Sequence, residues 1–287
     1  MVSDHGSFCV GCGQRSTNSD LKEKEMKRRC LRSVVVFMMI VACGSAMGAE
    51  RILIAHDELP QMKFLAALLQ ERCGYDVEVK TQPEMPPELS DYKSVIVFIH
   101  GKMFEEPEKA FIAYTKAGGR LIVLHHSISS GKRKNTFWFD FLGIKLPQGD
   151  WQEGGYKWIE PVAQKVVNIN PGHYITSHNM KYEGRISYKS DKVKPGQYPC
   201  FTLKKNSEVY LNHTFTDRNE KTLLLGFIYD GEKIGGKKIM QHTSAWLKKV
   251  GKGWLIYLQA GHSMEDMQTK PFQQIIINAI QWSQEKK

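Results

Sequence analysis

Histidines stand at the ends of four short apolar runs in this sequence of 287 residues. The runs begin at residues 51, 94, 120 and 254, and the histidines are His56, His100, the adjacent pair His125 and His126, and His262. Short runs of Val, Ile and Leu separated by helical patterns indicate a buried parallel sheet, and open α/β sheets gather ligand-binding groups at the carboxyl ends of their strands. We therefore expect the histidines to meet at one edge of the sheet. The candidate catalytic residues are His56, His125, His126 and His262.

Imidazoles that meet at such an edge have two kinds of chemistry open to them. They can transfer protons to and from a substrate near neutral pH, because the ordinary pKa of histidine lies close to that range. Neutral imidazoles also bind divalent transition metals, zinc first. For a metal site, the sequence favours His56, His125 and His262 as nitrogen ligands. The candidates for an oxygen ligand are Asp57, Glu58 and Glu265.

Apolar periodicity predicts the elements that must position these residues. Helical spacing predicts helices over residues 58–73, 105–117 and 271–283, and Gly74 and Gly118 end the first two. Strands are expected at the four apolar runs and at residues 75–80, and residues 165–241 are rich in strand patterns. The resulting β-α-β-β-α-β order favours a doubly wound sheet with right-handed crossovers. No internal repeat is present, so residues 49–287 are expected to form one domain.

Aromatic residues cluster between residues 127 and 158. Trp138 and Trp151 lie in this stretch among several phenylalanines and tyrosines. Aromatic rings serve both as core fillers and as platforms for ligands, so the stretch has two interpretations. Either a helix and hairpin pack these rings against the core, or the rings form a wall on which a sugar stacks.

The first 48 residues differ in composition from the rest of the chain. Residues 26–48 are predicted to be a signal peptide, because a basic stretch is followed by an apolar run at 33–42 and small residues at 46–48. Residues 1–25 lie upstream of it and are interpreted as a mis-called start. The apolar run is far shorter than the roughly 20 residues that span a bilayer. A bacterial lipobox is the alternative, and it would place a lipid anchor on Cys43.

Export and charge together narrow the class of partner. Both processing routes predict an exported protein, periplasmic or secreted to the extracellular side, with no membrane span. The formal net charge is +10 at pH 7, but Lys and Arg are scattered in twos and threes instead of forming a stripe with stacking aromatics. We therefore expect no nucleic-acid partner, and the sequence favours no particular oligomeric state.

Several short motifs occur in an order that resembles a known family. They are Gly118-Gly119-Arg120-Leu121-Ile122-Val123-Leu124-His125, Pro171-Gly172-His173-Tyr174-Ile175-Thr176, Trp246, Ala260-Gly261-His262 and Ala279-Ile280-Gln281-Trp282. This arrangement is similar to that of the trehalose-utilisation (ThuA-like) family, in the class I glutamine amidotransferase-like superfamily. The resemblance covers nearly all of residues 49–287. It implies an α/β, three-layer, flavodoxin-like fold with a mainly parallel sheet.

The resemblance also implies a role in carbohydrate metabolism, often near keto-sugars, and hence a carbohydrate ligand. The candidate substrate-binding residues are then Trp138, Trp151, Trp246 and His173. Two positions depart from the family pattern. Tyr174 stands where a proline usually follows the histidine, and no acidic pair is evident before the mid-chain Tyr188. The second departure argues against chemistry that depends on a carboxylate.

The residues after the apolar run at 120–124 exclude one activity of the superfamily. A glutamine amidotransferase needs a cysteine on the turn there, so that its thiolate can attack the amide. This chain has His125, His126 and Ser127 instead. The leading hypothesis is an exported protein that binds and transforms a sugar or keto-sugar at the histidines. The alternatives are a non-catalytic carbohydrate-binding or envelope interaction protein and a hydrolase with Ser127 as nucleophile.

Overall fold

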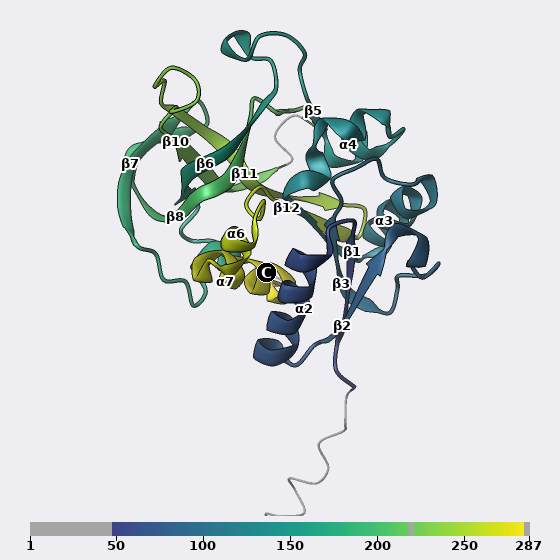
Figure 1. The fold of residues 1–287 in the computed structure, drawn as a ribbon. Coiled ribbons are helices and arrows are strands. Elements are labelled where there is room, and N and C mark those ends of the chain that lie inside the picture. Colours follow the sequence, from purple (N-terminus) through teal and green to yellow (C-terminus); the bar gives the residue numbers. More distant parts are fainter. Residues whose placement is uncertain (1–47, 218–220, 284–287) are drawn as a thin grey trace, which may run out of the picture. The chain divides into compact units, whose positions relative to one another are not determined.

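The computed structural model of the protein describes residues 48–217 and 221–283 (Figure 1). Residues 26–47 of the predicted signal peptide, which include Cys43 of the lipobox, lie outside the described residues. Within the described ranges, no helix combines the length and apolar character needed to cross a membrane.

Ten strands of the described chain form one mixed sheet. In spatial order they are β2 (Asp76–Thr81), β1 (Arg51–His56), β3 (Tyr92–Phe98), β4 (Arg120–Leu124), β12 (Gly253–Leu258), β11 (Ile239–Val250), β10 (Thr222–Tyr229), β6 (Lys157–Asn168), β8 (Val193–Leu211) and β7 (Gly184–Ser190). A second, two-stranded sheet pairs β5 (Ile144–Lys145) with β9 (Thr214–Phe215). The α-helices are α2 (Leu59–Cys73), α3 (Glu105–Ala117), α4 (Trp138–Leu142), α5 (Tyr174–Ser177), α6 (Met264–Gln268) and α7 (Lys270–Gln281). Short 3₁₀ helices are η1 (Gln82–Glu84), η2 (His125–Ile128), η3 (Ser130–Lys134) and η4 (Trp151–Glu153).

One half of the sheet has the order expected for a doubly wound fold. β2, β1, β3, β4 and β12 are parallel to one another, and this succession is the flavodoxin-like 2-1-3-4-5 order. The predicted strand at 51–56 and helix at 105–117 are confirmed at their bounds, and α2 and α7 overlap the helices predicted at 58–73 and 271–283. The prediction of an α/β fold is therefore confirmed.

The expectation of a mainly parallel sheet is wrong for the other half. β11, β10, β6, β8 and β7 are antiparallel to their neighbours, and β11 joins the parallel half through an antiparallel pairing with β12. The physical reason lies in the connections. Parallel neighbours need a crossover of a dozen or more residues, usually a helix, whereas antiparallel neighbours need only a tight turn. The described part of residues 165–241 contains a single four-residue helix, α5, and so can form only a few crossovers.

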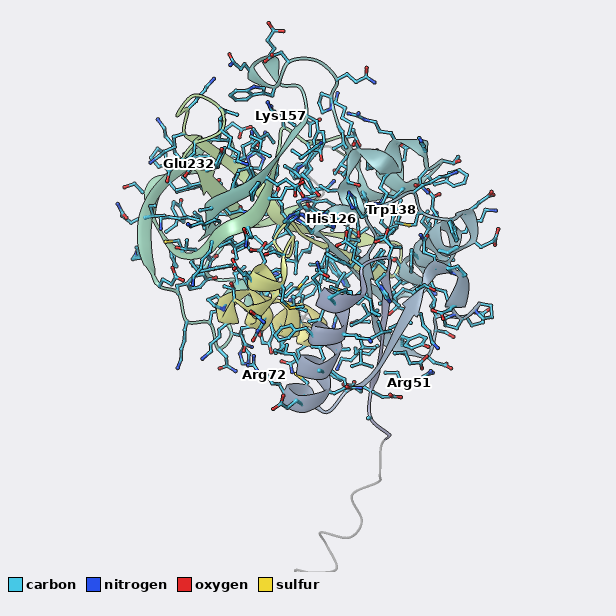
Figure 2. The ribbon with its side chains drawn as sticks, in the orientation of Figure 1. Arg51, Arg72, His126, Trp138, Lys157 and Glu232 are labelled. Carbon is cyan, nitrogen blue, oxygen red and sulfur yellow. The ribbon has the colours of Figure 1, made fainter. Side chains whose placement is uncertain are left out.

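Side chains of the parallel strands alternate between two covered faces. Ile54 and Ile122 pack with α2 and α7 on one face, and Leu53 and Val123 pack with α3 and α4 on the other. Because both faces are buried, these strands carry uninterrupted apolar runs, and polar groups can begin only at the strand ends. In Figure 2, His126 lies just past the carboxyl end of β4, far along the strands from Arg51 at the start of β1.

His213 is a buried histidine outside this edge, and it predicts an acid-sensitive fold. Its ring is 2% exposed, and neither ring nitrogen has a hydrogen-bond partner among the described residues. Burial lowers its pKa from 6.5 to about 3, and the nearby His242 and Lys221 act in the same direction. The ring of Tyr257 packs edge-on against it.

Between pH 6.5 and about pH 3, His213 is therefore protonated in the unfolded chain but neutral in the folded chain. The free energy of unfolding falls as the pH falls through this range. From pH 7 to pH 5 we expect His213 to remove about 2 kcal/mol of the free energy of unfolding. The variant His213→Leu should lose less stability over the same range. Urea unfolding of both proteins at the two pH values measures the difference, and an identical pH dependence would contradict the expectation.

Candidate functional site

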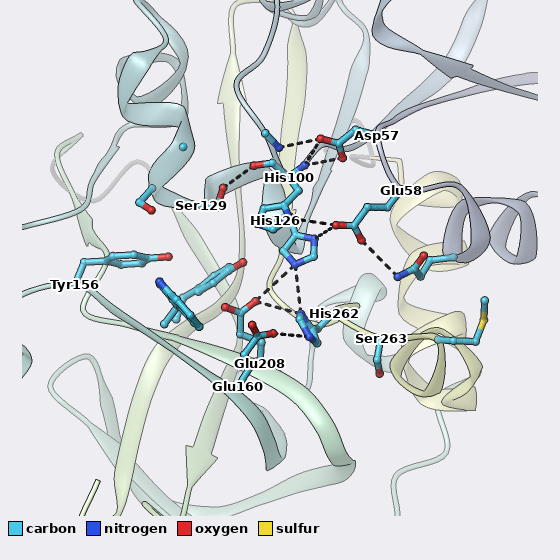
Figure 3. Close-up of a pocket in the computed structure, with 17 residues that line it drawn as sticks. Asp57, Glu58, His100, His126, Ser129, Tyr156, Glu160, Glu208, His262 and Ser263 are labelled. Carbon is cyan, nitrogen blue, oxygen red and sulfur yellow. Dashed lines mark hydrogen bonds and ion pairs between the residues drawn. The ribbon is translucent and has the colours of Figure 1, made fainter. Parts of the chain in front are cut away.

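A cavity of about 1000 Å³ opens at the carboxyl ends of the parallel strands (Figure 3). From the ends of parallel strands it receives Asp57 and Glu58 after β1, His100 after β3, His126 after β4 and His262 after β12. From the antiparallel half it receives Tyr156 just before β6, Trp158 and Glu160 on β6, and Glu208 and Tyr210 on β8. The site is thus assembled from both halves of the sheet.

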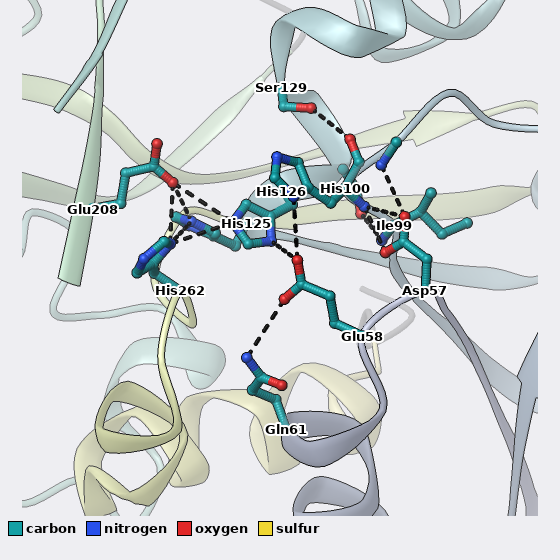
Figure 4. A network of polar contacts seen from close by, with 12 residues as sticks. Asp57, Glu58, Gln61, Ile99, His100, His125, His126, Ser129, Glu208 and His262 are labelled. Atoms are coloured by element: carbon teal, nitrogen blue, oxygen red, sulfur yellow. Dashed lines mark hydrogen bonds and ion pairs between the residues drawn. The ribbon is translucent and has the colours of Figure 1, made fainter. Parts of the chain in front are cut away.

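Four side chains converge on one point beside this cavity (Figure 4). They are His125, His126, His262 and Glu208, and one nitrogen or oxygen atom of each lies within 4.8 Å of the others. Glu208 Oε2 lies 2.8 Å from His125 Nε2, 3.2 Å from His262 Nδ1 and 3.7 Å from His126 Nε2. His262 Nδ1 lies 3.2 Å from His125 Nε2 and 3.3 Å from His126 Nε2. We call these four residues the histidine cluster.

The outer nitrogen of each imidazole in the histidine cluster faces an oxygen. These contacts join His125 Nδ1 to the backbone oxygen of Gln259, His262 Nε2 to Glu160 Oε2 at 2.7 Å, and His126 Nδ1 to Glu58 Oε1 at 3.4 Å. An oxygen in this position orients the ring and selects its tautomer. The rings of His125 and His262 are therefore held with their inner nitrogens toward Glu208, whereas His126 Nδ1 has no hydrogen-bond partner among the described residues.

The turn after β4 carries two of these rings, and its backbone is strained at His125. His125 has a φ of 35°, which residues other than glycine rarely adopt. Ser127 Oγ donates to the backbone oxygen of Val97 at 2.9 Å and so ties the turn to β3. Lys132 is buried, which lowers its pKa to about 7, and its Nζ donates to the backbone oxygen of His126 at 3.0 Å. These contacts fix the direction of the His125 and His126 side chains.

Glu208 sets the electrostatics of the histidine cluster. Burial opposes its ionisation, but hydrogen bonds from His125 and His262 hold its pKa below the ordinary value. Burial by itself would lower the pKa of His262, but Glu208 and Glu160 beside it raise that pKa. Burial and the neighbouring His125 lower the pKa of His126 to about 2. A buried carboxylate anion thus faces a neutral His126.

Three aromatic side chains, Tyr156, Trp158 and Tyr210, form a wall of the cavity. We call them the aromatic wall. Tyr210 stacks on His125 with 4.9 Å between ring centroids and 19° between planes, and Tyr156 lies 5.9 Å from Tyr210 between centroids. Trp158 is 52% exposed. The wall therefore presents apolar ring surface directly beside the charged groups of the histidine cluster.

Comparison with known proteins identifies the family of the chain. A family model described as ThuA, trehalose utilisation, matches residues 49–283. The chain belongs to the ThuA family. This membership indicates a role in carbohydrate metabolism. No curated protein matches the sequence.

Several solved structures are similar to this chain, and the first of them shares its fold. A ThuA-like protein from Bacteroides uniformis has a TM-score of 0.56 and 18% identity, over 83% of this chain and 92% of its own. A β-galactosidase from Rahnella sp. R3 has a TM-score of 0.49 and 14% identity, over 81% of this chain and 30% of its own. A GMP synthase protein from Thermoplasma acidophilum has a TM-score of 0.41 and 12% identity, over 82% of this chain and 94% of its own.

The structure of this ThuA-family protein brings together three of the four histidines predicted to be catalytic. His125, His126 and His262 meet in the histidine cluster, but His56 does not. His56 is the last residue of β1 and 4% exposed, and it does not line the cavity. It is therefore packed with its strand, whereas the other three follow the ends of theirs. His100 lines the cavity and stacks on His126 with 4.3 Å between ring centroids.

The three carboxylates that the sequence suggests as metal ligands differ in their position relative to the cavity. Glu58 lines the cavity and contacts His126, as described above. Asp57 also lines it, but its carboxylate accepts hydrogen bonds from the backbone N–H groups of His100 and Gly101. Glu265 is exposed on the first turn of α6 and does not line the cavity.

The residues predicted to bind substrate lie away from the cavity lining. Trp138 and Trp246 are fully buried in the core, which agrees with the core-filling interpretation of such rings. Trp151 packs against an apolar group at the antiparallel end of the sheet. His173 caps α5, because its Nδ1 accepts from the backbone N–H of Ile175. Ser127 is fully buried and its hydroxyl is bonded to β3, so it is not presented to the cavity as a nucleophile.

Sequence reasoning missed the carboxylates and rings that the antiparallel half contributes. Glu208 stands two residues before Tyr210, in an apolar strand pattern. It is a single acidic residue shortly before a tyrosine, whereas the sequence interpretation considered an acidic pair near Tyr188. A search around every tyrosine of the strand-rich region would have found it. Glu160 and Trp158 carry no comparable signal.

Proposed function

We propose that this ThuA-family protein binds a sugar or keto-sugar in the cavity and transforms it at the histidine cluster. The observation that supports this best is the aromatic wall beside Glu208 and the three histidines. Sugar rings have an apolar C–H face that packs on aromatic rings, and polar edges that need hydrogen bonds. A volume of about 1000 Å³ lies at the upper end of small-molecule sites, which is room for a disaccharide. The family description agrees with such a ligand.

Each part of the cavity has a role in this proposal. Trp158, as the exposed member of the aromatic wall, stacks on the sugar ring. Glu58 and Glu160, which are partly exposed, offer carboxylate oxygens to sugar hydroxyls. The histidine cluster lies where the reacting carbon or oxygen would be placed. Imidazoles there act either as acid and base groups or as ligands of a metal that polarises a carbonyl.

The variant Trp158→Ala tests the ligand-binding part of this proposal. We expect its affinity for trehalose, or for a keto derivative of trehalose, to fall about tenfold or more, because the stacking surface is lost. Isothermal titration calorimetry measures the affinity. Trp151→Ala is the matched control, since Trp151 lies outside the cavity and its removal should leave the affinity unchanged. Equal affinities of the wild type and Trp158→Ala would exclude the aromatic wall as the sugar platform.

Conversion of the bound sugar is a separate question with its own test. The variant His125→Ala should lose conversion of the keto-sugar, followed by NMR, while it keeps the binding that Trp158 provides. Binding without conversion in the wild type would instead identify a non-catalytic carbohydrate-binding protein.

We also propose that the chain is exported, on the basis of the signal-peptide pattern at residues 26–48. The mass of the mature amino terminus distinguishes the two routes. Cleavage after residue 48 gives an unmodified terminus, and lipobox processing gives a lipid-modified Cys43. A chain that retains residues 26–48 in the cytoplasm would contradict export.

A further inference from the structure

We propose that the histidine cluster binds one divalent transition-metal ion. The ligands are His125 Nε2, His126 Nε2, His262 Nδ1 and Glu208 Oε2, which face a common point (Figure 4). Three imidazoles and one carboxylate suit zinc and its neighbours in the first transition row, and zinc is the probe used below. The site differs from the set of His56, His125 and His262 favoured by the sequence. It stands independently of the proposed sugar ligand, and it supplies a mechanism for acting on one.

The outer contacts of the cluster allow its inner nitrogens to present lone pairs to an ion. Each neutral imidazole has one N–H and one lone pair, and an acceptor oxygen at the outer nitrogen holds the proton there. The acceptors are the backbone oxygen of Gln259 for His125 and Glu160 Oε2 for His262. His126 Nδ1 lies 3.4 Å from Glu58 Oε1 without a hydrogen bond among the described residues. His125 and His262 hydrogen-bond to Glu208 through their inner nitrogens when no ion is bound. With these protons released, three nitrogen lone pairs and a carboxylate oxygen would face one another. A single proton can join only two of these four atoms, whereas a metal ion can join all four.

Five of the six spacings among the four atoms lie near those of a tetrahedral coordination shell. With metal–nitrogen and metal–oxygen bonds of about 2.0–2.2 Å, neighbouring ligand atoms of a tetrahedron lie about 3.3–3.6 Å apart. Among the described atoms, Glu208 Oε2 lies 2.8, 3.2 and 3.7 Å from the three inner nitrogens. His262 Nδ1 lies 3.2 and 3.3 Å from the other two nitrogens. Small side-chain adjustments would therefore complete the shell around an ion.

The charge around the cavity also favours a cation. The described lining includes the carboxylates Asp57, Glu58, Glu160 and Glu208 and contains no Lys or Arg. The buried ammonium of Lys132 is a nearby positive group, and it is bonded to backbone oxygens behind the turn instead of to these carboxylates. A concave surface lined by one sign of charge concentrates ions of the opposite sign.

A metal at this point would act on the ligand of the proposed function. The His262 side chain is 21% exposed, so this side of the cluster is open to the cavity. An ion held there would supply Lewis acidity, and a keto oxygen of a sugar packed on the aromatic wall would reach it as a fifth ligand. Glu160 is then a positioning residue, because it orients His262 without reaching the ion itself.

Zinc binding to the full chain tests the proposal. The protein is stripped with a chelator, and isothermal titration calorimetry and elemental mass spectrometry measure affinity and stoichiometry. We expect one zinc per chain in the wild type and at least a 100-fold weaker affinity in His126→Ala, since a direct ligand should matter more than the 10–100-fold typical of outer contacts. His56→Ala is the matched control, because His56 is a buried strand-end histidine outside the cluster, and its zinc affinity should be unchanged.

Cobalt substitution keeps the test valid if His126→Ala fails to fold. Four-coordinate Co²⁺ absorbs visible light far more strongly than the six-coordinate aqua ion. The absorption of the cobalt-loaded wild type therefore tests the predicted four-coordinate shell without any variant. No binding, weak absorption of the aqua type, or equal zinc affinity in His126→Ala and wild type would each overturn the proposal. Sugar affinity measured on the stripped protein separates the two ideas. Sugar binding without metal binding refutes the metal site alone, and metal binding without sugar binding refutes the proposed ligand alone.

Discussion

Replacement of Trp246 by alanine is expected to lower the free energy of unfolding by about 3–5 kcal/mol. The ring is fully buried and lies 5.4 Å from Tyr257 and 5.8 Å from Phe215 between ring centroids. Alanine would leave a cavity that the surrounding strands cannot close. Because Nε1 of Trp246 has no hydrogen-bond partner within the described part of the chain, the loss comes from packing. Urea unfolding followed by circular dichroism measures it.

Trp158→Ala is the matched control for this loss. Trp158 is 52% exposed, so its removal should change the free energy of unfolding by no more than about 0.5 kcal/mol. The two tryptophans therefore predict opposite results: Trp246→Ala affects stability, and Trp158→Ala affects sugar affinity. A similar loss of stability in both variants would contradict the burial on which the distinction rests.

The histidines could be placed from the sequence because a buried parallel strand has an uninterrupted run of apolar residues. β4 ends at Leu124 and β12 at Leu258, and the first polar side chains after them include His125 and His262. Strands that share a sheet edge must bring such residues together. His56 marks the limit of the argument. It is the last residue of β1 instead of a residue beyond it, so one position decides whether the side chain packs with its strand or reaches the site.

The carboxylates could not be placed in the same way. Glu208 lies 83 residues from His125 in the sequence, on an antiparallel strand whose partner is set by pairing and not by a crossover. The pairing of β6 with β8 is irregular between Ile159 and Val162, next to Glu160. Such irregularities change the face to which a side chain points. Sequence periodicity does not encode their position, and so the antiparallel contribution to the cavity could not be predicted.

Tryptophan shows a related limit of composition. A tryptophan can fill the core or serve as a platform for a ligand, and the residue type alone does not distinguish these roles. Burial in the folded chain does. Trp138 donates its Nε1–H to the backbone oxygen of Ser127 at 2.7 Å and is fully buried. Trp158 lies on β6 and lines the cavity. The difference depends on strand register, which again follows from pairing over long sequence distances.

The two carboxylates nearest the proposed metal should differ sharply in their importance for zinc affinity. Glu208→Gln keeps the shape of the side chain but replaces a charged ligand by a neutral amide, and we expect the affinity to fall by more than about 100-fold. Glu160 contacts only the outer nitrogen of His262, at 2.7 Å. Outer contacts of this kind typically change metal affinity about 10–100-fold, so Glu160→Gln should have the smaller effect. Competition with a chelator of known affinity measures both.

The order of these two effects locates the ion. Glu183→Gln is a matched control, because Glu183 bonds to Thr202 and does not line the cavity. If Glu208→Gln weakens binding more than Glu160→Gln, the ion lies among the inner nitrogens, where only Glu208 reaches it. The reverse order would place the ion between His262 Nε2 and Glu160, outside the histidine cluster. In that case the inner nitrogens would be held together by protons, and acid and base catalysis would become the better account of the site.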